Sequence, residues 1–168
     1  MAASEKSDVQ IVPVEGAAAL ATVRMLLQEY WDSFGFTPCF QNFEDELTGL
    51  PGAYAPPAGR LALATVDGQP AGCIALRPVD ALRAEPKRLY VRPAFRGFGL
   101  GRILLEWVMN EARSAGYQEL VGDTMPVMKD ALALYDRMGW ERTGSGAPVQ
   151  TTQFPQIREE PILIRIKL

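Results

Sequence analysis

The stretch Arg96-Gly97-Phe98-Gly99-Leu100-Gly101-Arg102 decides how this chain is interpreted. The segment before it, Lys87–Val91, is typical of a strand, and an amphipathic helix is predicted over Gly101–Ala115. The N–H groups at a helix start have no acceptor inside the helix and carry partial positive charge. Three alternating glycines let this backbone approach a ligand closely, and an arginine stands at each end. The turn therefore favours a ligand that carries phosphate.

Strand-like and helical segments alternate along the rest of the chain. The predicted strands are Asp8–Val14, Arg60–Val66, Ala71–Pro78, Lys87–Val91, Glu119–Asp123, Val149–Phe154 and Ile162–Leu168; the predicted helices are Glu15–Phe34, Phe40–Leu50, Gly101–Ala115 and Pro126–Met138. A hairpin is expected at Asp67–Pro70, and a loop at Leu82–Pro86. The strand–helix–strand passage around the glycine turn requires a parallel pair. We therefore predict an α/β fold with a mixed sheet.

Length and composition indicate one globular domain over residues 1–168. No apolar run approaches the roughly 20 residues that span a bilayer, and the first residues lack the apolar core of a signal peptide. We expect a cytoplasmic protein that does not engage a membrane. Cys39 and Cys73 have no metal spacing and are expected to be buried thiols. No dense basic cluster with aromatic residues is present, which argues against nucleic-acid binding.

The chain contains no histidine, which excludes Ser–His and Cys–His nucleophile pairs and most zinc sites. Charge is uneven along the chain. Residues 1–80 carry 10 acidic and 4 basic residues, whereas residues 81–168 carry 10 acidic and 13 basic ones. The basic half suits a phosphorylated ligand, and the acidic half is either a site for a cationic substrate or a solvated surface.

Glycine spacing narrows the choice of phosphate ligand. A P-loop ends in Gly-Lys-Ser/Thr, whereas Gly101 is followed by Arg102 and Ile103. A dinucleotide fold uses G-x-G-x-x-G early in the chain and an acidic residue roughly 20 positions later. Asp123 meets the last criterion loosely, so a dinucleotide-binding oxidoreductase stays open as an alternative.

The pattern Arg96-x-x-Gly99-x-Gly101 resembles the Q/R-x-x-G-x-G/A pyrophosphate loop of the GNAT superfamily of acyl-coenzyme A-dependent N-acyltransferases. Leu89–Pro93 resembles the family's central strand. Ala131–Trp140 resembles the helix that closes its site, with Trp140 where phenylalanine is common. The stretches Leu50–Gly59 and Ala71–Arg77 resemble small bacterial members. Together the matching segments cover most of residues 15–142.

The resemblance implies a mostly antiparallel sheet whose parallel pair is splayed for coenzyme A. It also implies acetyl-CoA as co-substrate, no metal and a small-molecule amine acceptor, and it allows a homodimer. Backbone groups of the splayed strand would bind the pantetheine arm, with the Val91 N–H facing the thioester oxygen. The cofactor-binding residues implied are Leu89, Tyr90, Val91, Arg96, Gly97, Phe98, Gly99, Leu100, Gly101, Arg102 and Thr124. Asp123 and Thr124 either line the cofactor groove or cap the last helix.

Tyr135 is the catalytic acid that the resemblance implies, because a phenol can protonate a departing thiolate. It also lies on an apolar helical stripe, so a core tyrosine is the other interpretation. Glu85 is the implied base for the amine. Strand alternation would place Glu85, Lys87, Leu89 and Val91 on one face, although Pro86 interrupts that strand. Other groups for the amine proton are Glu29, Tyr30, Asp32, Glu46 and bulk water.

The function expected from these features is acetyl transfer from acetyl-CoA to a primary amine. Two alternatives stay open. One is an acyl-CoA-binding module in which Tyr135 and Glu85 do no chemistry. The other is the dinucleotide-binding oxidoreductase, against which the glycine spacing and the late position of the turn both count.

Overall fold

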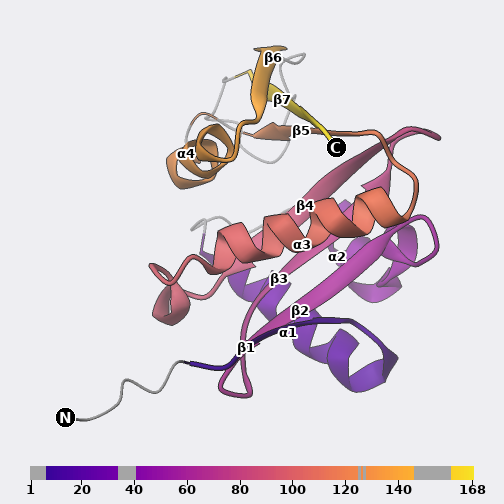
Figure 1. The fold of residues 1–168 in the computed structure, drawn as a ribbon. Helices are drawn as coiled ribbons and strands as arrows, with labels where there is room; N and C mark the ends of the chain where they lie inside the picture. The colour runs from indigo at the N-terminus through magenta and orange to yellow at the C-terminus, as the bar shows by residue number, and fades with distance from the viewer. Residues whose placement is uncertain (1–6, 34–40, 125, 127, 146–159) are drawn as a thin grey trace.

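A seven-stranded sheet in the order β1-β2-β3-β4-β5-β7-β6 runs through the molecule (Figure 1). The computed structural model describes residues 7–33, 41–124, 126, 128–145 and 160–168. In chain order the elements are β1 (Val9–Pro13), α1 (Gly16–Asp32), α2 (Gln41–Gly49), η1 (Gly52–Tyr54), β2 (Arg60–Val66), β3 (Gln69–Pro78), β4 (Arg83–Val91), η2 (Pro93–Phe95), α3 (Leu100–Ser114), β5 (Glu119–Thr124), α4 (Lys129–Arg137), β6 (Glu141–Ser145) and β7 (Ile162–Lys167). Up to α4 this order of strands and helices confirms the prediction, and the chain ends in the predicted strand; β6 was not predicted.

Strand β4 joins two antiparallel parts of the sheet through one short parallel contact. Pairings β1–β2, β2–β3, β3–β4, β5–β7 and β6–β7 are all antiparallel. The parallel β4–β5 pairing contains only Arg83 with Glu119 and Ala84 with Leu120, after which the two strands diverge. The mixed sheet with a splayed parallel core is therefore confirmed, and the splay opens toward the carboxyl ends of β4 and β5.

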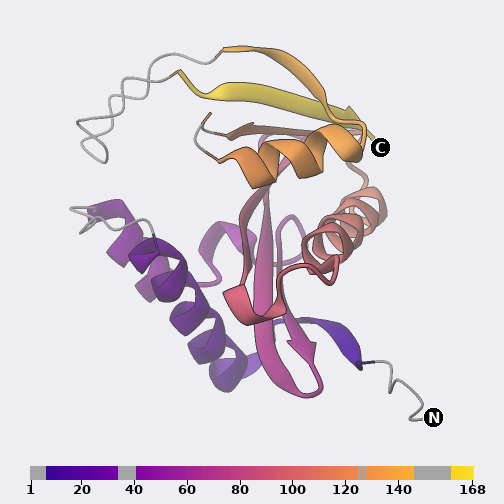
Figure 2. The same cartoon turned by 90° about the vertical axis from the view of Figure 1, so that its left-hand side faces the viewer.

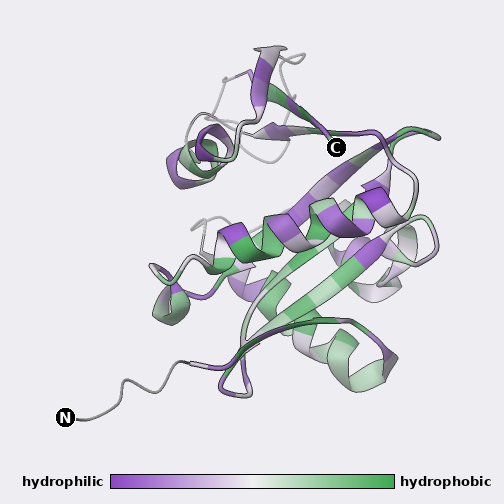
Figure 3. Cartoon of the chain, viewed as in Figure 1, coloured by the Kyte–Doolittle hydropathy of each residue, from purple (hydrophilic) through white to green (hydrophobic). Residues whose placement is uncertain are grey.

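Helices cover both faces of the sheet, as Figure 2 shows with α1 on one side and α3 on the other. Two apolar clusters fill the interfaces. Leu104, Leu105 and Val108 of α3 pack in one cluster, and Val23, Leu26 and Leu27 of α1 pack in the other. Figure 3 shows the matching pattern, with β2 and β3 mostly green and α3 alternating along its length. Full burial of each such side chain stabilises the fold by about 1.5–3 kcal/mol.

Strand β4 begins earlier than predicted. The expected loop at Leu82–Pro86 is wrong, because β4 starts at Arg83 and Pro86 pairs in register with Leu76 of β3. Beyond Ala84 the strand pairs with no described residue on the β5 side. A strand with one open side behaves locally as an edge, where proline is tolerated.

A bulge in β4 overturns the predicted alternation of its side chains. Cys73 pairs with Tyr90 but Ala75 pairs with Lys87, so Arg88 and Leu89 together oppose Ile74. One extra residue reverses the side-chain phase along the strand. Consequently Leu89 packs with the α3-side cluster, whereas Tyr90 packs with the α1-side cluster.

The C-terminal part differs from the prediction in the start of one helix and in one strand that was not predicted. Helix α4 begins at Lys129 rather than Pro126, and the sixth strand is Glu141–Ser145. The strand predicted at Val149–Phe154 lies outside the described residues. Among the residues that are described, no helix combines the length and apolarity that a membrane crossing needs.

Candidate functional site

A cavity of about 840 Å³ opens where β4 and β5 diverge. Its walls are the end of β4, the glycine turn before α3, and one face of α4, with Tyr30 and Ser33 contributed from the end of α1. The lining residues are Tyr30, Ser33, Leu89, Tyr90, Val91, Phe95, Arg96, Gly97, Gly99, Leu100, Gly101, Arg102, Met128, Lys129, Asp130, Ala131, Ala133, Leu134 and Arg137. Most of the residues that the resemblance implied for cofactor binding therefore line this cavity.

The glycine turn presents open backbone to this cavity. Gly97 and Gly99 have φ values of +87° and +75°, which L side chains rarely adopt, and a Cβ at either position would meet no atom of the described residues within 4 Å. Gly99 is the N-cap of α3 and supplies no capping side chain. The first N–H groups of α3 have no acceptor within the helix. This combination fits an anionic group such as a pyrophosphate.

Basic side chains give the cavity a positive character. Among the described residues, Arg96, Arg102, Lys129 and Arg137 line it, against the carboxylate of Asp130. Arg102 also pairs with Glu106 one turn along α3, at 2.7 Å. An excess of positive charge in a concave site attracts and holds a polyanion.

The edge of β4 turns its backbone toward the cavity at Val91. Arg92 donates its N–H to the Ala71 carbonyl oxygen on β3, at 2.8 Å. Since peptide groups of successive residues point to opposite edges of a strand, the N–H and C=O of Val91 point away from β3. The Arg96 guanidinium donates to the Val91 carbonyl oxygen at 2.9 Å, on that open side.

Tyr135 lies beside the cavity rather than on its wall. The ring is half-buried on α4 and makes an edge-on contact with Trp140, with the ring centroids 5.0 Å apart. Burial raises the pKa of Tyr135, and nearby Tyr30, Asp123 and Glu85 raise it further. The phenol is therefore protonated at neutral pH and lies within electrostatic range of groups from α1, β4 and β5.

Glu85 is buried, with both carboxylate oxygens held by cations. The Arg77 side chain donates to Oε2 at 2.8 and 2.9 Å, and the Lys87 ammonium lies 2.8 Å from Oε1. Lys87 also contacts the exposed Asp123 at 3.2 Å. Charges of alternating sign thus extend from β3 across the splay to β5.

The other carboxylates considered for the amine proton all have partners. Arg92 donates to both oxygens of Glu29 at 2.9 and 2.5 Å. Gln28 donates to Asp32 at 2.9 Å. Glu46 accepts from Arg88 and from the Tyr54 hydroxyl. Tyr30 lies on the cavity wall, and its ring centroid is 5.4 Å from that of Tyr90.

Two of the residues expected to hold the cofactor lie outside the cavity lining. Phe98 projects outward with 73 % of its surface exposed, which leaves only its backbone near the turn. Thr124 is buried on β5, and its hydroxyl has no hydrogen-bond partner among the described residues. The expected cap on the last helix is wrong, because the N-cap of α4 is Met128.

The resemblance placed this helix at the site, but the residues of α4 and its N-cap that line the cavity were not predicted. Met128, Lys129, Asp130, Ala131, Ala133, Leu134 and Arg137 line it. Their helical periodicity identified an apolar stripe but did not show which polar positions flank a ligand. Lys129 and Arg137, about two turns apart, were the available signal for an anion.

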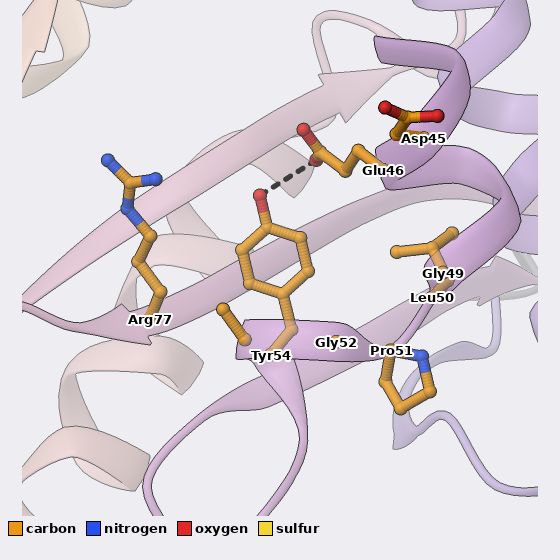
Figure 4. Close-up of a pocket in the computed structure, with 9 residues that line it drawn as sticks. Asp45, Glu46, Gly49, Leu50, Pro51, Gly52, Tyr54 and Arg77 are labelled. Atoms are coloured by element: carbon orange, nitrogen blue, oxygen red, sulfur yellow. Dashed lines mark hydrogen bonds between the residues drawn. The ribbon is translucent and has the colours of Figure 1, made fainter. Parts of the chain in front are cut away.

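A second, smaller hollow of about 220 Å³ lies at the end of α2 (Figure 4). Figure 4 shows the Tyr54 hydroxyl directed at Glu46, with Arg77 on the other side of the ring. Arg77 connects this hollow to Glu85, and so to the splay of the sheet.

Comparisons with known proteins agree on one family. Residues 21–140 match the model of the acetyltransferase (GNAT) family. An uncharacterised N-acetyltransferase of Schizosaccharomyces pombe is 36 % identical over 139 residues, which is 82 % of this chain and 85 % of the relative. An acetyltransferase structure from Streptococcus agalactiae superimposes with a TM-score of 0.75 at 22 % identity, covering 95 % of this chain and 98 % of that one. A GNAT acetyltransferase from Elizabethkingia anophelis, solved with acetyl-CoA bound, gives 0.69 at 24 % identity, with coverages of 97 % and 100 %.

Proposed function

Because this chain belongs to the GNAT acetyltransferase family and is therefore an acyltransferase, we propose that it transfers an acetyl group from acetyl-CoA to a primary amine. We take the acceptor to be a small molecule or an amino-acid-like compound. The open glycine turn at the start of α3, facing a cavity lined by four basic side chains, carries the assignment of the donor. The acetyl-CoA bound to the Elizabethkingia anophelis protein supports it.

Different groups of the chain would bind the different parts of acetyl-CoA. Backbone N–H groups from Gly97 to Arg102 would bind the pyrophosphate, assisted by the charge of Arg96, Lys129 and Arg137. The exposed edge of β4 at Leu89–Val91 would hold the pantetheine arm. There the Val91 N–H would stabilise negative charge on the thioester oxygen, a contribution of roughly 3–4 kcal/mol for one such donor.

The transfer needs two proton movements and one exchange of bonds. The amine nitrogen forms a bond to the acetyl carbon while the bond from carbon to sulfur breaks. Tyr135 would donate its hydroxyl proton to the departing sulfur. The proton lost by the amine would go to Glu85, either directly or through a water molecule. Tyr135 is in the state that this step requires, since its raised pKa leaves the phenol protonated at neutral pH.

A pH series separates a base from a merely structural carboxylate at Glu85. We expect Glu85→Gln to lower turnover at neutral pH by about 100-fold, the lower end for general base catalysis. Raising the pH should restore much of that loss, because the amine then loses its proton to solvent. Asp123→Asn is the matched control, since it also removes a partner of Lys87. Equal losses in both variants at every pH would refute the role of Glu85.

Thermal unfolding tests the donor without any acceptor. At about 100 times its Kd, a ligand stabilises the native state by about 2.7 kcal/mol. In a domain of this size that raises Tm by about 5–11 °C. We expect this rise with acetyl-CoA and none with NAD. A rise with NAD alone would favour the dinucleotide-binding oxidoreductase.

Release of free coenzyme A, followed against a panel of amines, amino acids, polyamines, aminoglycosides and peptides, tests the full proposal. Acceptor-dependent release confirms acetyl transfer and identifies the acceptor class. Tight acetyl-CoA binding with no release for any amine would favour the non-catalytic acyl-CoA-binding module.

A further inference from the structure

The bulge in β4 is centred on an arginine in an unusual backbone conformation. Arg88 has φ of +59°, in the left-handed region that disfavours a side chain with a Cβ. By shifting the phase of the strand, the bulge decides which face each side chain takes just where the strand enters the cavity: Leu89 packs in the α3-side cluster and Tyr90 in the α1-side cluster. A strained conformation of this kind persists only where surrounding contacts hold it.

Contacts from two helices hold the Arg88 side chain, and a third element holds its partner Glu46. Its Nε and Nη2 donate to the two carboxylate oxygens of Glu46 on α2, at 2.8 and 2.6 Å. The guanidinium lies over the Trp31 ring of α1, 5.5 Å from the centroid. The Tyr54 hydroxyl of η1 donates to the same Glu46 carboxylate at 2.8 Å, as Figure 4 shows. We call the pair of Arg88 and Glu46 the β4 clamp.

The backbone at Arg88 is also held. The Cys73 thiol of β3 donates to the Arg88 carbonyl oxygen, at 3.5 Å. Burial alone would raise the pKa of Glu46, but the hydrogen bonds and charge of Arg88 outweigh it and hold the pKa below its usual value. Both members of the clamp are therefore charged at neutral pH. A planar guanidinium fixes a carboxylate in one geometry, which a lysine would not do.

From these contacts we infer that Arg88 is a positioning residue for acetyl transfer. The β4 clamp holds the bulge that sets Leu89–Val91, and it ties that segment to α2, the helix bordering the hollow in Figure 4. The helices on one face of the sheet thereby control where the thioester-binding edge lies. The inference rests on the proposed acetyl transfer, because it assigns the edge of β4 to the thioester.

Steady-state kinetics of clamp variants test the inference. Arg88→Gly allows the left-handed backbone without strain but removes the β4 clamp. Glu46→Gln removes the negative charge of the clamp. Arg88→Lys keeps a positive charge but loses the paired hydrogen bonds of the guanidinium. We expect kcat at saturating substrates to fall by about 100-fold in Arg88→Gly, as a misplacement of about 1 Å can produce. The Kd for acetyl-CoA should change by less than about threefold, since a factor of three is under 1 kcal/mol. Arg88→Lys should recover part of kcat.

A second ion pair in the chain provides the matched control. Arg60 and Glu111 are similarly half-buried, with Nε and Oε2 2.7 Å apart, and neither lines the cavity. We expect Glu111→Gln to lower Tm as much as Glu46→Gln does while kcat stays at the wild-type value. If the clamp variants lower only Tm and keep kcat, the positioning role is overturned while the acetyltransferase function stands. If the wild-type chain transfers acetyl to no amine, both the function and the role fail.

Discussion

Gly99→Glu should abolish acetyl-CoA binding, with Kd rising by roughly 100-fold or more, since placing like charges together costs several kcal/mol. Gly99 lines the cavity, and a side chain there has open space to enter it. The new carboxylate would reach the free N–H groups at the start of α3 and occupy the seat proposed for the pyrophosphate. Isothermal titration calorimetry with acetyl-CoA measures the change.

Gly116→Glu is the control for this variant. Gly116 has φ of +92° at the other end of α3, and a Cβ there would also meet no atom within 4 Å in the part of the chain that the structure describes. Its substitution carries the same backbone strain, about 1–2 kcal/mol, but lies away from the cavity. We expect Gly116→Glu to lower Tm and to bind acetyl-CoA as the wild type does. Retained binding in Gly99→Glu would contradict the assignment of the turn.

Tyr135→Phe should lower kcat by about 100-fold or more, the range for general acid catalysis, with acetyl-CoA affinity almost unchanged. The substitution removes only the hydroxyl and leaves the ring contact with Trp140. Because the pKa of Tyr135 is raised, we also expect wild-type turnover to show no loss from phenol ionisation near pH 10, where an ordinary tyrosine titrates. A pH profile of kcat for both proteins measures these effects.

Tyr117→Phe shows what the loss of a buried tyrosine hydroxyl does elsewhere. Tyr117 is buried, and its hydroxyl donates to the Ala58 carbonyl oxygen at 2.8 Å, away from the cavity lining. We expect its substitution to change stability and leave kcat as it is. Unchanged kcat in Tyr135→Phe would make Tyr135 the core tyrosine that its apolar stripe also predicts.

Features set by neighbouring residues could be predicted from the sequence. The Asp67-Gly68 hairpin, the glycine turn at Arg96–Arg102 and the helix stop at Gly116 depend on backbone preferences of a few adjacent residues. Together with the periodicity of the segments between them, they predicted the order of strands and helices up to α4, and hence the parallel core. The likeness of that turn to a known pyrophosphate loop then supplied the family.

Features set by tertiary contacts could not be predicted. Nothing in Lys87-Arg88-Leu89 marks Arg88 for a left-handed conformation, because the groups that hold it come from α1 and α2, and Glu46 lies 42 residues away in sequence. Without the bulge, strict alternation assigned Leu89 and Glu85 to the same face. Pro86 was assigned to a loop because the open side of β4 depends on where β5 diverges.

The short β4–β5 pairing divides the sheet into two plates, β1-β2-β3-β4 and β5-β7-β6. The two plates are connected through two residue pairs, Arg83 with Glu119 and Ala84 with Leu120. One plate carries the glycine turn and the edge of β4, and the other carries Tyr135. The angle between the plates therefore sets the spacing between the group that would hold the thioester and the group that would protonate its sulfur. A substitution at these two pairs, which are not part of the cavity lining, would alter that spacing as directly as a change within the site.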